Sequence, residues 1–87
     1  MINVRYPCPC CGFRTLRSKS PGSFELCPVC HWEDDNVQAA DPDFAGGANL
    51  ESLNEARRNY REFGASSPNS RDSVRPASSD EYPENSE

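Results

Sequence analysis

Three features of the 87-residue sequence predict a small α+β fold. Two Cys-x-x-Cys pairs lie fifteen residues apart, two short β-prone segments flank a turn between them, and a later stretch has a helical period. This cysteine spacing is typical of a tetrahedral zinc site. We therefore predict a zinc-stabilised domain with a zinc-ribbon β-hairpin core, one C-terminal amphipathic helix and a disordered tail.

The size and composition of the chain favour such a metal. Only 34% of the residues are apolar, and eight are prolines. A chain this short buries too little apolar surface to be robust by burial alone, whereas a structural zinc ion contributes on the order of 10 kcal/mol to folding. We expect removal of the metal to unfold much of the domain.

Four paired cysteines are the predicted ligands of one Zn²⁺ ion: Cys8, Cys11, Cys27 and Cys30. Gly12 lets the chain leave the first pair with positive φ. Two disulfides or a thioredoxin-like redox pair are the alternatives. We expect neither, because no signal peptide is recognisable and no βαβ unit accompanies either pair. Iron also suits four thiolates, so the sequence favours zinc without excluding iron.

Two further residues lie beside these ligands. Cys10 sits between Cys8 and Cys11 in the sequence, where its side chain should point away from the metal. We interpret it as a small, partly buried core residue, with an auxiliary ligand or a redox-sensitive thiol as the alternative. His31 follows Cys30. Because four cysteines complete a tetrahedron, we expect His31 near the ligands or at the surface, with auxiliary ligation as the alternative.

The predicted strands lie around the two cysteine pairs. Asn3–Tyr6 alternates weakly and could form a short strand before the first pair. Phe13–Arg17 and Ser23–Leu26 are separated by the turn-forming Ser20–Gly22 and predict a β-hairpin that delivers the second pair. The ends of this hairpin would bring the cysteines together.

An acidic, turn-rich segment follows Trp32 and extends to Gly47. Its carboxylates could be interpreted as a calcium or magnesium loop, but the EF-hand order is absent. We predict a solvated loop. Trp32 with Glu33, Asp34 and Asp35 is the predicted partner-binding surface, because an aromatic anchor ringed by charge is a plausible hot spot.

A helix is predicted over residues 50–63. The apolar residues that share one face of it are Leu50, Leu53, Ala56, Tyr60 and Phe63. Asn49 is the expected N-cap, and Gly64 fits the position after the last turn. We expect the apolar face to pack on the ribbon, with Trp32, Phe44 and Phe13 as its counter-surface.

The remaining sequence divides the chain into a domain and a tail. Residues 65–87 are Ser/Pro-rich and acidic with almost nothing to bury, so we expect them to be disordered. The predicted domain is therefore residues 1–64.

The net charge bears on the partner. The formal charge is −5, and four thiolates with one Zn²⁺ would lower it to about −7. This balance disfavours simple phosphate binding, although Arg14, Arg17 and Lys19 could form a local basic face with the helix arginines Arg57, Arg58 and Arg61. No apolar run reaches membrane-spanning length. We expect a soluble cytoplasmic protein.

Three blocks of the sequence resemble the bacterial CPCC family of cysteine-rich proteins. They are Tyr6–Gly12 (YPCPCCG), Cys27–Asp35 (CPVCHWEDD) and Gly46–Tyr60 (GGANLESLNEARRNY). The resemblance extends from about Tyr6 to Ala65 and implies a small bacterial zinc-binding domain. It implies the fold more than a function, and it does not include the tail.

We therefore expect a non-enzymatic, zinc-binding module that recognises another protein, since no catalytic constellation is visible in the sequence. A specific form of this hypothesis is an immunity or antitoxin protein, or another regulatory protein, whose acidic surface meets a basic partner. The alternatives are a nucleic-acid-binding zinc ribbon and a thiol-based redox or metal sensor centred on Cys10.

Overall fold

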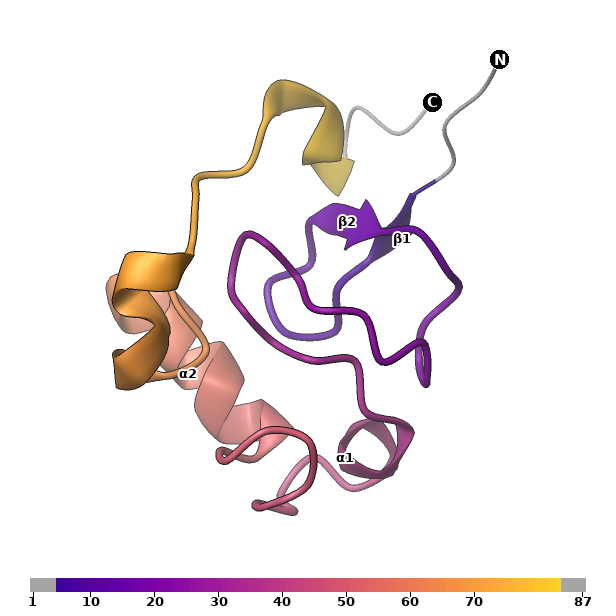
Figure 1. The fold of residues 1–87 in the computed structure, drawn as a ribbon, viewed down its shortest axis with the longest axis vertical. Coiled ribbons are helices and arrows are strands. Elements are labelled where there is room, and N and C mark those ends of the chain that lie inside the picture. Colours follow the sequence, from indigo (N-terminus) through magenta and orange to yellow (C-terminus); the bar gives the residue numbers. More distant parts are fainter. Residues whose placement is uncertain (1–4, 84–87) are drawn as a thin grey trace.

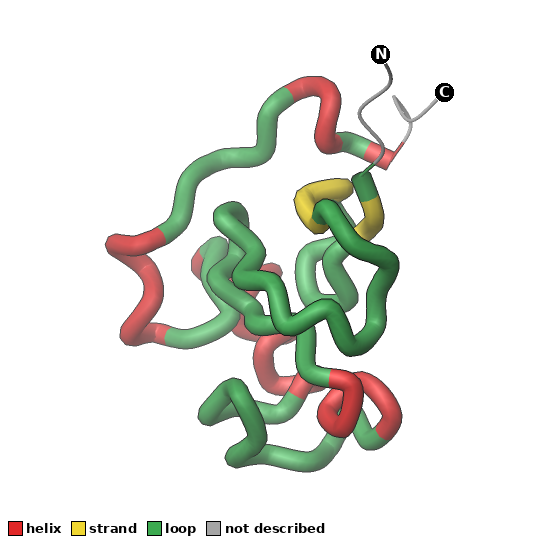
Figure 2. The backbone as a smooth tube through the Cα atoms, turned by 45° about the vertical axis from the view of Figure 1, so that its right-hand side comes forward, coloured by secondary structure: helices red, strands yellow, loops and turns green. Residues whose placement is uncertain are grey.

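The computed structural model describes residues 5–83. Its elements are the strands β1 (Tyr6–Pro7) and β2 (Arg14–Leu16), the helices α1 (Asn36–Ala40) and α2 (Leu53–Phe63), and the 3-10 turns η1 (Pro68–Ser73) and η2 (Ser79–Glu81). Long loops connect them and surround the small hairpin (Figures 1 and 2). The architecture is a small α+β fold with a two-stranded hairpin, as predicted. No helix within residues 5–83 is long and apolar enough to cross a membrane.

The hairpin differs from the predicted one. β1 and β2 are antiparallel neighbours, with Tyr6 opposite Leu16, and the first cysteine turn (residues 8–12) lies between them. The predicted pairing of Phe13–Arg17 with Ser23–Leu26 is therefore wrong, because β2 uses β1 as its partner. Of the strand expected before the first pair, only the end at Tyr6 belongs to β1, and its start lies outside the described residues.

The segment before the second cysteine turn (residues 27–31) pairs with the segment after it. Leu26 and Glu33 form an antiparallel bridge, and the Asp34 N–H donates to the Glu25 carbonyl at 3.0 Å. The Glu25 carboxylate contacts the chain just after β2, where it accepts from the N–H groups of Arg17 at 2.8 Å and Ser18 at 2.7 Å. Each cysteine turn is thus enclosed by its own flanking segments, which explains why the two turns do not share one hairpin.

The acidic segment after Trp32 is organised by buried hydrogen bonds. Asp34 is fully buried, and its carboxylate accepts from the Ser20 hydroxyl at 2.9 Å and from the Ser23 hydroxyl at 2.6 Å. Asp35 caps α1 by accepting from the Val37 N–H at 2.7 Å. Buried carboxylates need such donors, so the prediction of a solvated loop is wrong for Asp34 and Asp35.

A buried glutamine fixes the rest of this loop. The Gln38 amide is buried and donates to the carbonyls of Phe44 and Glu51 at 2.9 Å each. The Asn49 side chain donates to the Gln38 oxygen at 2.9 Å and also bonds both backbone groups of Glu33. Because the amides satisfy the loop's backbone groups, the loop is ordered with few apolar contacts.

The helix α2 begins later than predicted. Ser52 is its N-cap, and Ser52 and Glu55 form a reciprocal capping box that satisfies two free N–H groups. Asn49 is not the cap, since its side chain is engaged by Glu33 and Gln38. Leu50 consequently lies before the helix and is 73% exposed. The predicted end is confirmed, because Gly64 closes the helix in the left-handed conformation with φ 85°.

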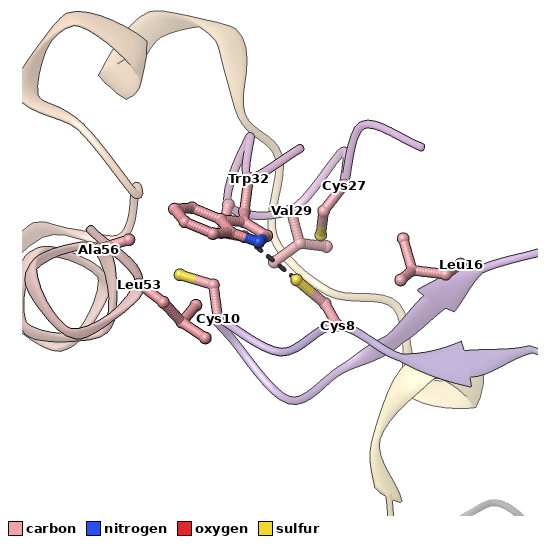
Figure 3. Close-up of a cluster of buried hydrophobic side chains, with 9 residues drawn as sticks. Cys8, Cys10, Leu16, Cys27, Val29, Trp32, Leu53 and Ala56 are labelled. Atoms are coloured by element: carbon pink, nitrogen blue, oxygen red, sulfur yellow. Dashed lines mark hydrogen bonds between the residues drawn. The ribbon is translucent and has the colours of Figure 1, made fainter. Parts of the chain in front are cut away.

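The core lies between α2 and the cysteine turns (Figure 3). Trp32 is fully buried and packs in one cluster with Leu53 and Ala56 of α2. Phe13 packs edge-on against Tyr60 with ring centroids 6.3 Å apart. Trp32 and Phe13 therefore supply the counter-surface that was predicted for the helix, whereas Phe44 is 43% exposed and does not join it.

Residues 65–83 are ordered and pack on the domain. After α2 the chain runs past the second cysteine turn and ends beside β2 (Figure 1). The Ser66 N–H donates to the Cys30 carbonyl at 2.8 Å and the Arg75 N–H to the Pro28 carbonyl at 3.2 Å. The expectation of disorder is therefore wrong for this part of the tail, because backbone hydrogen bonds fix it where apolar side chains are scarce. Residues 84–87 lie outside the described part.

A bidentate ion pair closes the tail. Arg75 contacts both carboxylate oxygens of the buried Glu81 at 2.9 and 2.8 Å. The Ser78 N–H donates to the same carboxylate at 2.9 Å, and Tyr82 packs edge-on against Phe13 at 4.9 Å. Arg75 lowers the pKa of Glu81 to about 2.

Removing this ion pair should loosen the tail and destabilise the domain. Arg75→Ala leaves the buried Glu81 carboxylate without its charged partner, so we expect a loss of about 1–3 kcal/mol in the free energy of unfolding. Urea denaturation of the metal-loaded chain measures this loss, with Arg58→Ala as an exposed control. Equal stability of the two variants would contradict the role of Arg75.

The same pair gives a pH dependence of defined sign. Because the folded pKa of Glu81 is about 2 and the ordinary value is 4.5, its stabilisation is complete above pH 4.5 and is lost as the pH falls toward 2. Because acid also protonates thiolate ligands and releases a bound metal, the test is made where the metal stays bound: the stability difference between the parent and Arg75→Ala should be constant from about pH 8 down to about pH 6. Urea denaturation of the metal-loaded chain across this interval measures it, and a difference that shrinks within the interval would contradict the low pKa of Glu81.

Candidate metal centre

The first cysteine turn is held by two backbone hydrogen bonds. The Cys8 N–H donates to the Phe13 carbonyl at 2.9 Å, and the Gly12 N–H donates to the Cys8 carbonyl at 2.8 Å. Gly12 has φ 81°, a left-handed conformation that glycine adopts without steric cost. The turn thus directs the Cys8 and Cys11 sulfurs to the same side.

The second cysteine turn repeats this geometry. The Cys27 N–H donates to the Trp32 carbonyl at 2.9 Å, and the His31 N–H donates to the Cys27 carbonyl at 2.8 Å. His31 occupies the place that Gly12 has in the first turn and also has positive φ, at 73°. Two copies of one turn therefore face each other.

The four predicted ligands meet at one point. The Sγ atoms of Cys8, Cys11, Cys27 and Cys30 all lie within 4.8 Å of one another. Cys8 Sγ is 3.6 Å from Cys30 Sγ, and Cys11 Sγ is 3.7 Å from Cys27 Sγ. Four sulfurs bound tetrahedrally at about 2.3 Å from one ion would be roughly 3.8 Å apart. The spacing therefore fits one metal ion held by four thiolates, with two sulfurs from each turn.

The same distances do not fit disulfides. A disulfide joins its sulfurs at about 2.05 Å, far less than the 3.6 Å between Cys8 and Cys30. All five cysteines of the chain are free in this structure. The sulfurs are instead grouped as ligands, and three of the four ligand cysteines are buried.

The thiols also affect one another's protonation. Hydrogen bonding from Cys11, supported by Cys30 and Cys8, lowers the pKa of Cys27. Cys10 and Cys11, together with burial, raise the pKa of Cys30. One sulfur is therefore readily ionised while others resist ionisation, as expected for like charges in a buried site. A cation among the four sulfurs would remove this conflict by stabilising all the thiolates.

A threonine hydroxyl contacts one of the ligands. Thr15 of β2 is buried, and its Oγ1 lies 3.0 Å from Cys27 Sγ. A hydrogen bond of this kind orients a ligand and disperses the charge of a thiolate. Sequence reasoning missed Thr15, because nothing in the sequence indicates that β2 passes beside the second cysteine turn.

The two auxiliary candidates lie in different places. Cys10 belongs to the buried core cluster, and Figure 3 shows its sulfur directed toward the α2 side. It is outside the four-sulfur group, in keeping with the prediction of a core residue. The His31 ring also lies outside that group, and its Nδ1 is 3.1 Å from the Ser70 hydroxyl.

Most residues of the predicted partner-binding surface are buried. Trp32 and Asp34 are fully buried, and Asp35 is 6% exposed. The prediction that these three form an exposed contact patch is wrong, since Trp32 serves the core and both aspartates bond backbone or hydroxyl groups. Of the predicted set only Glu33 is partly exposed.

The sequence matches a known family over most of its length. The cysteine-rich CPCC family matches residues 6–81. The chain belongs to the cysteine-rich CPCC family. No curated protein gives a significant match.

The CPCC match extends beyond the resemblance recognised in the sequence. That resemblance ended at about Ala65, whereas the family match includes the ordered tail up to Glu81. The CPCC unit thus includes the Arg75–Glu81 pair, and the predicted domain boundary at residue 64 falls inside it.

Loss of one ligand should abolish the metal centre of this CPCC protein. Cys27→Ser removes a buried thiolate, so we expect loss of the bound metal and of most of the ordered structure. Cys10→Ser should keep both. Circular dichroism with metal analysis on the same samples measures these outcomes. A fully folded, metal-loaded Cys27→Ser protein would overturn the ligand assignment.

Loss of the Thr15 hydroxyl should weaken metal binding without unfolding the chain. Thr15→Val keeps the shape and the β-propensity of the residue but removes the contact with Cys27. We expect the affinity for the metal to fall roughly 10-fold, in line with other ligand-supporting hydrogen bonds. Competition with a chromophoric chelator measures the change, with Thr15→Ser expected to retain affinity. An unchanged affinity for Thr15→Val would exclude this role.

Proposed function

We propose that this CPCC protein is a non-enzymatic module that holds one Zn²⁺ ion and uses its folded surface to bind another protein. The observation that carries the first part is the grouping of four sulfurs within 4.8 Å of one another, with two pairs across the turns at 3.6 and 3.7 Å. Four thiolates fill a tetrahedron and leave no open coordination position for water or substrate. Such a centre stabilises a fold rather than activating a reactant.

The exposed apolar side chains support a role in protein binding. Large apolar residues that are about half exposed or more are Phe24, Leu26, Val37 and Leu50. Leu26 and Leu50 of this set line one groove, and exposed apolar residues that gather at one place are typical of a surface that meets a partner. The negative net charge of −5 favours a basic partner. An immunity or antitoxin protein, or another regulatory protein, is a specific form of this proposal.

Nucleic-acid binding is the second candidate. Arg5, Arg17 and Arg75 line one cleft of about 450 Å³, together with Glu25. Two observations disfavour nucleic-acid binding. Arg75 is already paired with Glu81, and Arg57, one of the helix arginines, donates to the Pro9 carbonyl at 3.0 Å. This candidate predicts an affinity for DNA or RNA that falls steeply with salt.

Native mass spectrometry of the protein purified gently from its own host tests the proposal. We expect one zinc ion per chain and a protein partner in stoichiometric amount. Cys8→Ser expressed in the same host is the control and should lose both. A metal-loaded chain that co-purifies with nucleic acid alone would favour the second candidate, and a metal-free chain with disulfides would overturn the proposal.

A further inference from the structure

An open groove of about 260 Å³ lies beside the second cysteine turn. Its walls come from that turn, from the loop before α2 and from the ordered tail. The lining residues on which the inference depends are Leu26, His31, Glu33, Leu50, Glu51 and Ser70. The volume is large enough for one long side chain and part of its neighbour.

Two leucines give the groove an apolar surface. Leu50 is 73% exposed and Leu26 is 51% exposed. Leu50 lies outside α2 because Ser52 caps that helix, so its exposure follows from the fold. Two exposed leucines that line the same groove offer apolar contacts to one bound group, unlike apolar residues scattered singly over a surface.

Two carboxylates lie in the same groove. Within residues 5–83, no side chain forms an ion pair or hydrogen bond with the carboxylates of Glu33 or Glu51, and no lysine or arginine lines the groove. The Glu33 N–H donates to the Asn49 side-chain oxygen at 2.8 Å, so the backbone that carries this carboxylate is fixed beside the groove. The groove therefore combines unpaired negative charge with apolar surface.

A strained histidine lies at the edge of the groove. His31 has φ 73° at the place where the first cysteine turn uses Gly12 at φ 81°. Glycine would adopt this conformation without the steric cost that a histidine bears. The imidazole is positioned by the tail, through Nδ1 and the Ser70 hydroxyl at 3.1 Å. Residues held in such sparsely populated backbone conformations cluster at binding and active sites.

We propose that this groove binds an arginine or lysine side chain of a partner protein together with an adjacent apolar residue. The alkyl stem of the basic side chain would lie on Leu26 and Leu50, and its charged head would meet Glu33 and Glu51. This inference rests on the proposed role in protein binding and specifies the surface and the chemistry of the partner.

Titration of the zinc-loaded full chain with a blocked peptide, acetyl-Leu-Arg-Leu-amide, tests the site. We expect saturable amide shifts at Leu26, His31, Glu33 and Ser70 in ¹⁵N NMR spectra. The matched peptide acetyl-Leu-Glu-Leu-amide should cause none. Absence of saturable shifts with the basic peptide, or shifts centred elsewhere, would overturn the assignment of the groove.

Matched variants test the two components of recognition. The double variant Glu33→Gln, Glu51→Gln should bind the basic peptide about 10-fold more weakly. Glu62→Gln, on the exposed part of α2, should leave the affinity unchanged. Leu50→Ser should also weaken binding of the basic peptide, whereas Val37→Ser, at a residue that is 54% exposed and lies outside the groove, should not. Equal effects of the groove and control variants would overturn the proposal.

His31→Gly separates function from stability. This substitution should raise the free energy of unfolding by relieving backbone strain, and it should at the same time lower the affinity for the basic peptide. An unchanged affinity for the basic peptide would show that His31 takes no part in binding. If the basic peptide fails to bind but the protein still co-purifies with a partner, the groove is wrong and the general role in protein binding stands.

Discussion

The convergence of four sulfurs on one point is the constraint on which the rest of the structure depends. The two cysteine turns have the same backbone hydrogen bonds, and each brings two thiols to the centre. Four thiols within 4.8 Å of one another, three of them buried, cannot all ionise without a cation among them. The core around Trp32, the helix α2 and the tail are assembled on these turns, so a metal bound there would substitute for the large apolar core that a chain of 87 residues lacks.

Buried polar side chains provide a second level of organisation. Asp34 joins the segment that follows the second cysteine turn to Ser20 and Ser23. Gln38 and Asn49 fix the loop that leads to α2. The Arg75–Glu81 pair does the same for the tail. Each of these groups satisfies donors or acceptors that would otherwise be buried without partners. Loops of low hydropathy can therefore be ordered around a metal centre, and they leave Leu26 and Leu50 free at the surface.

Local features were predictable from the sequence, and their assembly was not. The cysteine spacing and Gly12 indicated the sulfur cluster, and the period of Leu53, Ala56 and Tyr60 indicated the helix. The start of α2 was missed because Asn49 and Ser52 are both good caps, and only tertiary contacts engage Asn49 elsewhere. The Ser52–Glu55 spacing is the sequence signal that could have located it. Strand pairing and the burial of Trp32 and Asp34 depend on contacts between distant segments, which one sequence does not display.

The tail shows the same limit in another way. Its composition indicated disorder because it has few apolar residues, but its order comes from backbone hydrogen bonds to Cys30 and Pro28 and from the Arg75–Glu81 pair. Ser78 and Glu81 have the spacing of a capping box, which was the available local signal. Composition measures what a segment can bury, and it does not measure the hydrogen bonds that a neighbouring turn offers.

X-ray absorption at the zinc edge would determine whether four thiolates hold one zinc ion. On the protein purified from its host, we expect one zinc ion surrounded by four sulfur atoms at about 2.3 Å. A first shell that contains oxygen or nitrogen, or the absence of zinc in a folded chain, would contradict it.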